Sequence, residues 1–259
     1  MKNLFNKSFD EMMSLEGEVY RDQDNRKTIR FQHEGKSYFI KQHFGVGWKE
    51  IFKNLFQFRL PVISARNEWC AIQKLEILNV PTMKIAAFGE RYWNPARRQS
   101  FVATHALQDV ESLEDVCKNW KTTPPMFAEK LKLIRDVAHI ARTIHVNGVN
   151  HRDFYLCHFL QGKDKTLYLI DLHRVQMRAK TPMRWMVKDI SGLYFSAMDI
   201  GLTGRDILRF LACYFDKPWR EVIASKQLFL KRVEKRAICL YVKEQGGKLV
   251  YKKSSELLS

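Results

Sequence analysis

The segment at residues 150–158, Asn-His-Arg-Asp-Phe-Tyr-Leu-Cys-His, decides how the rest of the chain is interpreted. It follows a stretch, 127–147, in which apolar residues recur every three or four positions, as on one face of an α-helix. Two short strand-like runs, 159–160 and 167–170, come after it. The segment is therefore predicted to be a loop that joins a long helix to a short hairpin.

This loop contains the His-Arg-Asp tripeptide of kinase catalytic loops, in which the Asp accepts the proton of the hydroxyl that is phosphorylated. A second acid, Asp171, ends the hairpin. Phosphoryl transfer needs one carboxylate to orient the hydroxyl and another to hold Mg²⁺ against the phosphate oxygens. We predict that Asp153 is the catalytic base, with Arg152 in the catalytic set, and that Asp171 is a metal ligand. The alternative for each Asp alone is a loop residue or a helix cap.

Kinases also use a strand Lys, paired with a helix Glu, to hold the nucleotide phosphates. Lys41 ends the apolar strand pattern 37–41, and Glu68 lies on the apolar stripe of a helix predicted after Pro61. A buried carboxylate needs a partner, and Lys41 is the natural one. We predict that this pair binds ATP. The alternative is an exposed Lys at a strand end and a Glu on a solvated helix edge.

Two features of ordinary protein kinases are missing from this sequence. No G-x-G-x-x-G loop occurs near Gly17, and His158 takes the place of the Asn that normally binds a second Mg²⁺. Imidazole is a poorer ligand for Mg²⁺ than an amide oxygen. His158 is therefore a candidate metal ligand, with a substrate contact and a packed core histidine as the alternatives.

The order of the predicted elements indicates an α+β fold. Strands are predicted at 18–20, 28–31, 37–41, 83–88 and 100–104, with a turn at Glu34-Gly35, and helices at 49–59 and after Pro61. The second half is helical apart from the hairpin. We predict a bilobal, protein-kinase-like fold with a small strand-rich N-lobe at 1–105 and a larger helical C-lobe at 106–259.

The net charge of +16, from 44 Lys+Arg against 28 Asp+Glu, predicts an anionic partner: nucleic acid, a membrane surface or a phosphorylated substrate. No nucleic-acid motif is visible, so we predict no nucleic-acid partner. Five scattered cysteines without a C-x-x-C motif argue against disulfides and structural zinc, and favour a reducing compartment. No signal-like start and no apolar run near the ~20 residues of a spanning helix is found. We expect a cytoplasmic protein.

Longer motifs give a resemblance to a known family. They are Gly-Lys-Ser-Tyr-Phe-Ile-Lys at 35–41, Gly-Val-Asn-His-Arg-Asp-Phe-Tyr-Leu-Cys-His-Phe-Leu at 148–160, Ile-Asp-Leu-His-Arg at 170–174 and Lys-Asp-Ile-Ser-Gly-Leu-Tyr-Phe-Ser at 188–196. With these motifs the chain resembles the lipopolysaccharide core heptose kinases of Gram-negative bacteria, within the protein-kinase-like superfamily. His158 is usual in that family, whereas Phe154 stands where members often have Cys.

The resemblance implies transfer of the ATP γ-phosphate, with Mg²⁺, to an inner-core heptose of an anionic lipid A–core precursor. It also implies a peripheral place at the cytoplasmic face of the inner membrane. Because of Phe154, the resemblance leaves open which core sugar is phosphorylated. The sequence gives no indication for or against a helper protein.

Several basic residues after Asp171 are candidates for binding an anionic acceptor. They are Arg174, Arg178, Lys180, Arg184 and Lys188. The alternative for them is a solvated charged surface. The basic, aromatic helix at 49–59 is either an interfacial helix or packs on the small lobe. Asp189 is expected to brace the catalytic loop, and the aromatic residues near it to belong to the core.

Two other functions compete with this interpretation. A kinase that acts on protein Ser, Thr or Tyr has the same base and metal, but the missing Gly-rich loop and the short hairpin region argue against it. A non-catalytic, basic pseudokinase scaffold is the second. Its support is charge alone, and the joint presence of Lys41, Glu68, Asp153 and Asp171 argues against it.

Overall fold

The computed structural model describes residues 6–23, 25–56 and 64–244. The chain divides into two compact units. Unit 1 runs to Asp109 and also takes in Ile170–Val175, and unit 2 consists of Val110–Leu169 and the chain from Gln176 onward. The lobe boundary predicted at 105/106 stays a prediction. The segment Ile170–Val175 returns to unit 1 because hydrogen bonds to α3 hold it there, as described below.

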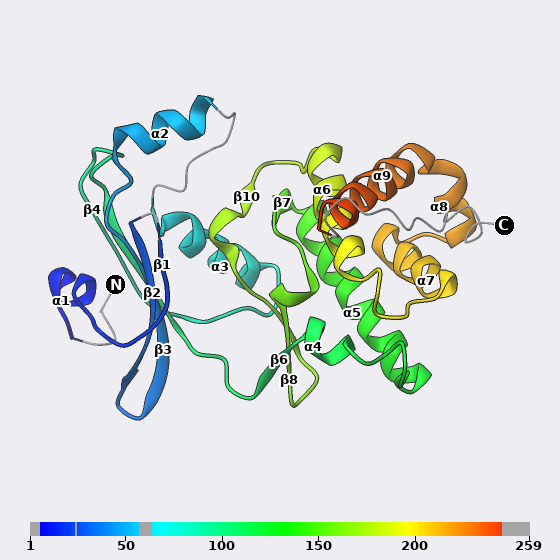
Figure 1. The fold of residues 1–259 in the computed structure, drawn as a ribbon, viewed down its shortest axis with the longest axis horizontal. Helices are drawn as coiled ribbons and strands as arrows, with labels where there is room; N and C mark the ends of the chain where they lie inside the picture. Colours follow the sequence, from blue (N-terminus) through cyan, green and yellow to red (C-terminus); the bar gives the residue numbers. More distant parts are fainter. Residues whose placement is uncertain (1–5, 24, 57–63, 245–259) are drawn as a thin grey trace. The chain divides into compact units, whose positions relative to one another are not determined.

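Unit 1 is an antiparallel sheet with helices (Figure 1). Its elements are α1 (Phe9–Met13), β1 (Glu18–Gln23), β2 (Arg26–His33), β3 (Lys36–His43), α2 (Gly47–Phe56), α3 (Arg66–Ile77), β4 (Ile85–Arg91), β5 (Gln99–His105) and the 3₁₀ turn η2 (Leu172–Arg174). The strand order is β1-β2-β3-β5-β4. All five predicted strands are present, and the predicted helix at 49–59 begins at Gly47, with its last three positions outside the described residues.

The turn between β2 and β3 sets the register of the central hairpin. His33 pairs with Lys36, and the two residues between them, Glu34 and Gly35, have φ angles of 49° and 71°. Two consecutive residues with positive φ are typical of the tight turn that matches the twist of a hairpin. The Glu34-Gly35 turn predicted from the sequence is confirmed.

The alternation of side chains in β3 separates two faces of this sheet. Tyr38 and Ile40 pack with Met12 of α1 in an apolar cluster, and the Gln42 side chain donates to the Met12 carbonyl. Because successive residues of a strand point to opposite faces, Lys41 lies on the other face, where it meets α3. The sequence pattern of β3 thus presents the Lys41 ammonium to α3.

Unit 2 is mainly helical. Its elements are β6 (Val110–Ser112), α4 (Leu113–Cys117), α5 (Phe127–Val146), β7 (Val149–Asn150), η1 (Leu156–His158), β8 (Phe159–Gly162), β9 (Leu167–Leu169), β10 (Gln176–Met177), α6 (Met183–Ser196), α7 (Gly204–Phe215), α8 (Trp219–Ser225) and α9 (Gln227–Glu244). α5 packs on α7, and α6 packs on α9. The predicted α+β class, strand-rich first and helical second, is confirmed.

Gly148 ends α5 and starts the catalytic loop. Its φ of 78° is rare for residues with a side chain, and a Cβ there would collide with the Arg178 carbonyl. Arg178 in turn donates its backbone N–H to the Gly148 carbonyl at 2.9 Å, beside the β7–β10 pair. The glycine therefore allows β10 to lie against the start of the loop.

Seven short elements were not predicted: α1, α4, β6, β7, β10 and the 3₁₀ turns η1 and η2. Each has only two to five residues, too few for a periodic pattern to be recognised. None of the helices in the described parts of the chain is both long and apolar enough to cross a membrane.

Candidate active site

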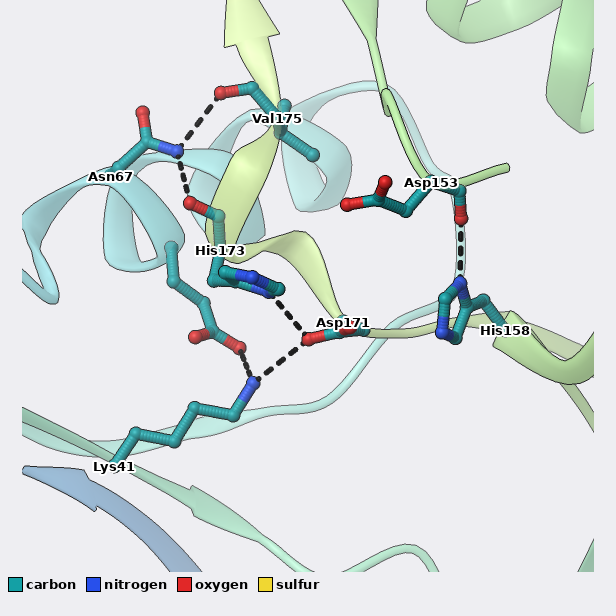
Figure 2. Close-up of polar contacts among 8 residues, drawn as sticks. Lys41, Asn67, Asp153, His158, Asp171, His173 and Val175 are labelled. Atoms are coloured by element: carbon teal, nitrogen blue, oxygen red, sulfur yellow. Dashed lines mark hydrogen bonds and ion pairs between the residues drawn. The ribbon is translucent and has the colours of Figure 1, made fainter. Parts of the chain in front are cut away.

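In unit 1, the ammonium of Lys41 lies between two carboxylates (Figure 2). Its Nζ donates to Glu68 Oε1 at 2.8 Å and to Asp171 Oδ1 at 3.3 Å. The Glu68 side chain is only 2% exposed, so its charge depends on this partner. Burial disfavours the charged ammonium, but Glu68 and Asp171 outweigh burial and raise the pKa of Lys41. The predicted Lys41–Glu68 pairing is present, and Lys41 is held as a cation.

His43 lies on the same face of β3 as Lys41, two residues further along. Burial, followed by the positive charges of Arg26, Lys41 and His173, lowers the pKa of His43 to about 3. The His43 ring is therefore neutral at physiological pH, and it adds no positive charge next to Lys41.

Asp171 is held in place through the segment that follows it. Its backbone has the left-handed φ of 59°, and its Oδ1 accepts a hydrogen bond from His173 Nδ1 at 2.7 Å. Asn67 of α3 donates its side-chain amide to the carbonyls of His173 and Val175, each at 2.9 Å. Asn67 neighbours Glu68 on α3, so one helix turn fixes both the partner of Lys41 and the segment that carries Asp171.

In unit 2, the catalytic loop is braced from beneath by Asp189 of α6. The Asp189 carboxylate is fully buried and accepts the backbone N–H groups of His151 at 2.6 Å and Arg152 at 2.8 Å. Arg152 has a φ of 76°, a conformation that persists only where surrounding contacts impose it. The expected bracing role of Asp189 is thus visible in its hydrogen bonds.

A buried chain of hydrogen bonds extends from Asp189 to α7. His145 Nε2 lies 3.2 Å from Asp189 Oδ2, and His145 Nδ1 lies 2.8 Å from the Tyr214 hydroxyl. Because a carboxylate only accepts, Nε2 carries the proton and Nδ1 accepts from Tyr214. Burial, and then the charge of Asp189, raises the pKa of Tyr214, which keeps its proton for this bond. The loop is therefore tied to both α5 and α7.

Asp153 and His158 lie together in the loop. His158 Nδ1 is 2.6 Å from the backbone carbonyl of Asp153, which can only accept, so Nδ1 is the donor (Figure 2). Histidines that bind metals commonly anchor the other ring nitrogen in this way. The contact therefore suits a metal ligand. It also positions the backbone of Asp153.

Of the predicted acceptor residues, three come together in unit 2. Arg178, Arg184 and Lys188 lie around the indole of Trp185, as does Arg152. Arg174 instead belongs to η2 of unit 1, and Lys180 is exposed in unit 2.

The residues of this region that were not predicted to have a role include Asn67, His145, His173, Trp185 and Tyr214. Asn67 acts over a sequence separation of 106 residues, for which a single sequence holds no signal. His173 stands two residues after the predicted metal ligand, Asp171. That position is the one feature of the sequence that could have indicated its role. Trp185 is one of the aromatic residues near Asp189 that the sequence assigns to the core.

No three His, Cys, Asp or Glu side chains converge as a metal cage within residues 6–23, 25–56 and 64–244. Asp171 is about a third exposed, so its carboxylate is reachable from solvent. Mg²⁺ commonly takes one or two protein carboxylates and completes its shell with phosphate oxygens and water. The donor set around Asp171 fits that mode of binding.

Comparison with known proteins gives consistent similarities. A sequence profile of the "Lipopolysaccharide kinase (Kdo/WaaP) family" matches residues 10–214. The lipopolysaccharide core heptose(I) kinase WaaP of Escherichia coli is 47% identical over 88% of this chain and 89% of that protein. WaaP of Pseudomonas aeruginosa is 45% identical over 92% of this chain and 91% of that protein.

Among solved structures, one of WaaP in complex with acyl carrier protein matches with a TM-score of 0.80. It is 40% identical in sequence, and the match covers 93% of this chain and 96% of that chain. The predicted fold agrees with that likeness.

Proposed function

The chain belongs to the lipopolysaccharide kinase (Kdo/WaaP) family, and on this premise we propose that it transfers the γ-phosphate of ATP to the first heptose of the lipopolysaccharide inner core. The names of the curated relatives support the acceptor. The observation that carries the proposal is the Lys41 ammonium held between Glu68 and Asp171, because a fixed cation is what the phosphates of a nucleotide require.

In this proposal each residue has one task. The oxygen of a heptose hydroxyl attacks the γ-phosphorus, the bond from that phosphorus to the oxygen of the departing ADP breaks, and the hydroxyl proton passes to the Asp153 carboxylate. Lys41, kept in position by Glu68, binds phosphate oxygens. Arg152 and Asp189 hold the loop that carries Asp153.

Asp171 would hold the Mg²⁺ ion, with His158 as a second ligand. The metal would supply charge neutralisation on the phosphate oxygens. The hydrogen bonds from Lys41 and His173 fix the orientation of the Asp171 carboxylate. The carbonyl anchor of His158 Nδ1 leaves the opposite nitrogen, Nε2, as the one with a lone pair.

The experiment is transfer of radiolabelled γ-phosphate from ATP to a purified core oligosaccharide that lacks phosphate on its heptoses. The wild-type chain should label the sugar, and Asp153→Asn should lower kcat by about 100-fold or more. Asp164→Asn is the matched control, since Asp164 is exposed in the β8–β9 turn. Label on protein alone would favour the protein-kinase alternative. Transfer by Asp153→Asn at the control's rate would contradict its role as base.

A peripheral place on the membrane is a further part of the proposal. α2 exposes a row of aromatic side chains: Trp48 is 51%, Phe52 52% and Phe56 85% exposed. Trp48 and Phe52 stack with ring centroids 5.8 Å apart. Exposed aromatic rings along one helix favour binding to the headgroup region of a bilayer, where the lipid-anchored acceptor resides.

An acyl carrier protein is the proposed protein partner, as it is in the related WaaP complex. Unit 2 contains an apolar cavity of about 470 Å³ between α4, α5, α6, α7 and α9. Trp120, Leu133, Ile190, Leu211 and Val233 are among its lining residues. An acyl chain is apolar and flexible, and it suits such a cavity. Co-purification of this chain with acyl carrier protein tests the partnership.

A further inference from the structure

Four cationic side chains of unit 2 gather around the indole of Trp185, in the first turn of α6. Their distances from the ring centroid are 5.5 Å for Arg152, 5.6 Å for Arg178, 5.3 Å for Arg184 and 5.8 Å for Lys188, measured from the guanidinium carbon or Nζ. Cations within about 6 Å of an indole are attracted by its π-system. Four of them around one ring also repel each other. We call these five residues the Trp185 cluster.

The charge of the cluster is not offset at Arg178 or at the start of α6. Arg178 donates to Asn150 Oδ1 and Gln176 Oε1, both neutral amide oxygens. The first turn of α6 has no acidic residue and holds Arg184. A cation at the N-terminus of a helix opposes the helix dipole, so this arrangement is unfavourable unless an anion joins it.

Trp185 itself has an unused donor. Its Nε1–H is buried and has no hydrogen-bond partner within the described residues. Buried donors are nearly always paired in folded proteins, and indole nitrogen can only donate. An oxyanion among the surrounding cations would give this N–H its acceptor.

The cluster also lies at the catalytic loop. Arg152 directly precedes Asp153, and its backbone is fixed at a φ of 76° by the bond from its N–H to Asp189. Asp189 belongs to the same helix, α6, as Trp185 and Lys188. A group bound by the cluster would therefore be held by the same elements that position the proposed base.

We propose that the Trp185 cluster binds a phosphate group that the acceptor already carries, and so selects a phosphorylated saccharide near the hydroxyl that reacts. This inference rests on the proposed function for the acceptor class. Phosphate fits better than carboxylate because it offers up to two negative charges and three free oxygens to four cations and an indole N–H.

The test is equilibrium binding of a fluorescently labelled, deacylated core oligosaccharide that has no phosphate on its heptoses but retains its other phosphates. Arg184→Gln and Lys188→Gln should each raise its Kd by roughly tenfold, as expected for a lost charge-assisted hydrogen bond, and Arg184→Lys should restore part of the affinity. Arg220→Gln is the matched control, because Arg220 is an exposed residue of α8 whose guanidinium carbon lies 4.4 Å from the centroid of the Trp219 ring. Deacylation removes any contribution from a membrane surface.

The second arm uses the same oligosaccharide after chemical removal of its phosphates. Binding by wild type should weaken to the level of Arg184→Gln, and the difference between the two proteins should disappear. An unchanged Kd in both Gln variants would overturn the inference, as would a difference that persists without phosphate. If the two Gln variants bound more weakly only to intact lipopolysaccharide in vesicles, the inference would also be overturned, and the cluster would be assigned to contact with a membrane surface. Phosphate-dependent binding without any transfer would count against the proposed function alone.

Discussion

Asp189→Asn tests the bracing of the catalytic loop most sharply. The Asp189 carboxylate accepts from the N–H groups of His151 and Arg152 through different oxygens, at 2.6 and 2.8 Å, and from His145 Nε2. An Asn keeps one carbonyl oxygen and turns an NH₂ group toward the other donors. One charge-assisted bond is lost and a buried donor is left unsatisfied, which together cost about 3 kcal/mol of unfolding free energy.

The same change should slow catalysis. Arg152 at φ 76° loses its restraint, and Asp153 beside it loses its fixed position. We expect kcat to fall by roughly 10- to 100-fold, with a smaller change in KM for ATP because Lys41 and Glu68 lie in unit 1. Urea unfolding and steady-state kinetics on one preparation measure both effects.

Asp199→Asn is the control for this experiment, because Asp199 follows the same helix but is exposed. Its unfolding free energy should stay within about 0.5 kcal/mol of wild type. If Asp189→Asn matched this control in stability and kept the wild-type kcat, the bracing role would be refuted. A stable variant with a slow kcat would separate positioning from folding.

Glu68→Gln should lower kcat/KM for ATP by about 30-fold, the equivalent of about 2 kcal/mol, because Lys41 loses its buried partner; an unchanged ATP dependence would contradict the pairing role. Burial favours the neutral form of Asp206, but hydrogen bonds led by that from Lys130 outweigh it and lower its pKa to about 2. Because the folded-state pKa lies below the ordinary 3.8, this stabilisation is present above that value and should disappear, by about 2 kcal/mol, as the pH falls toward 2. Urea unfolding at several acidic pH values should show this loss in wild type and not in Asp206→Asn. An unfolding free energy that falls equally with pH in both proteins would argue against this role of Asp206. Phe52→Ser should weaken flotation with anionic vesicles while leaving kcat on a soluble acceptor unchanged, and undiminished flotation would remove α2 from the membrane proposal.

The sequence was sufficient to predict contacts that follow from local pattern and charge. Period-2 alternation put Lys41 on the face of β3 opposite to Ile40, and helical periodicity put Glu68 on the buried stripe of α3. Since a buried carboxylate needs a cation, the pair followed from these two facts. The roles assigned to Asp153, Asp171 and His158 remain predictions.

Contacts that depend on tertiary structure could not be predicted from the sequence. Asn67 reaches carbonyls more than a hundred residues away, and an amide on a helix has no pattern that predicts such a bond. Trp185 looks like a core aromatic in sequence, and its role emerges only when Arg152, Arg178 and Lys188 surround it. The return of Ile170–Val175 to unit 1 is likewise a property of packing.

The most direct test of the proposed function is the position of the new phosphate. A core oligosaccharide whose heptoses carry no phosphate is incubated with the wild-type chain, ATP and Mg²⁺, and the product is analysed by phosphorus NMR and tandem mass spectrometry. We expect one phosphate monoester on the heptose nearest lipid A, and none with Asp153→Asn. A phosphate on another sugar, or no phosphorylated saccharide at all, would contradict the proposed function.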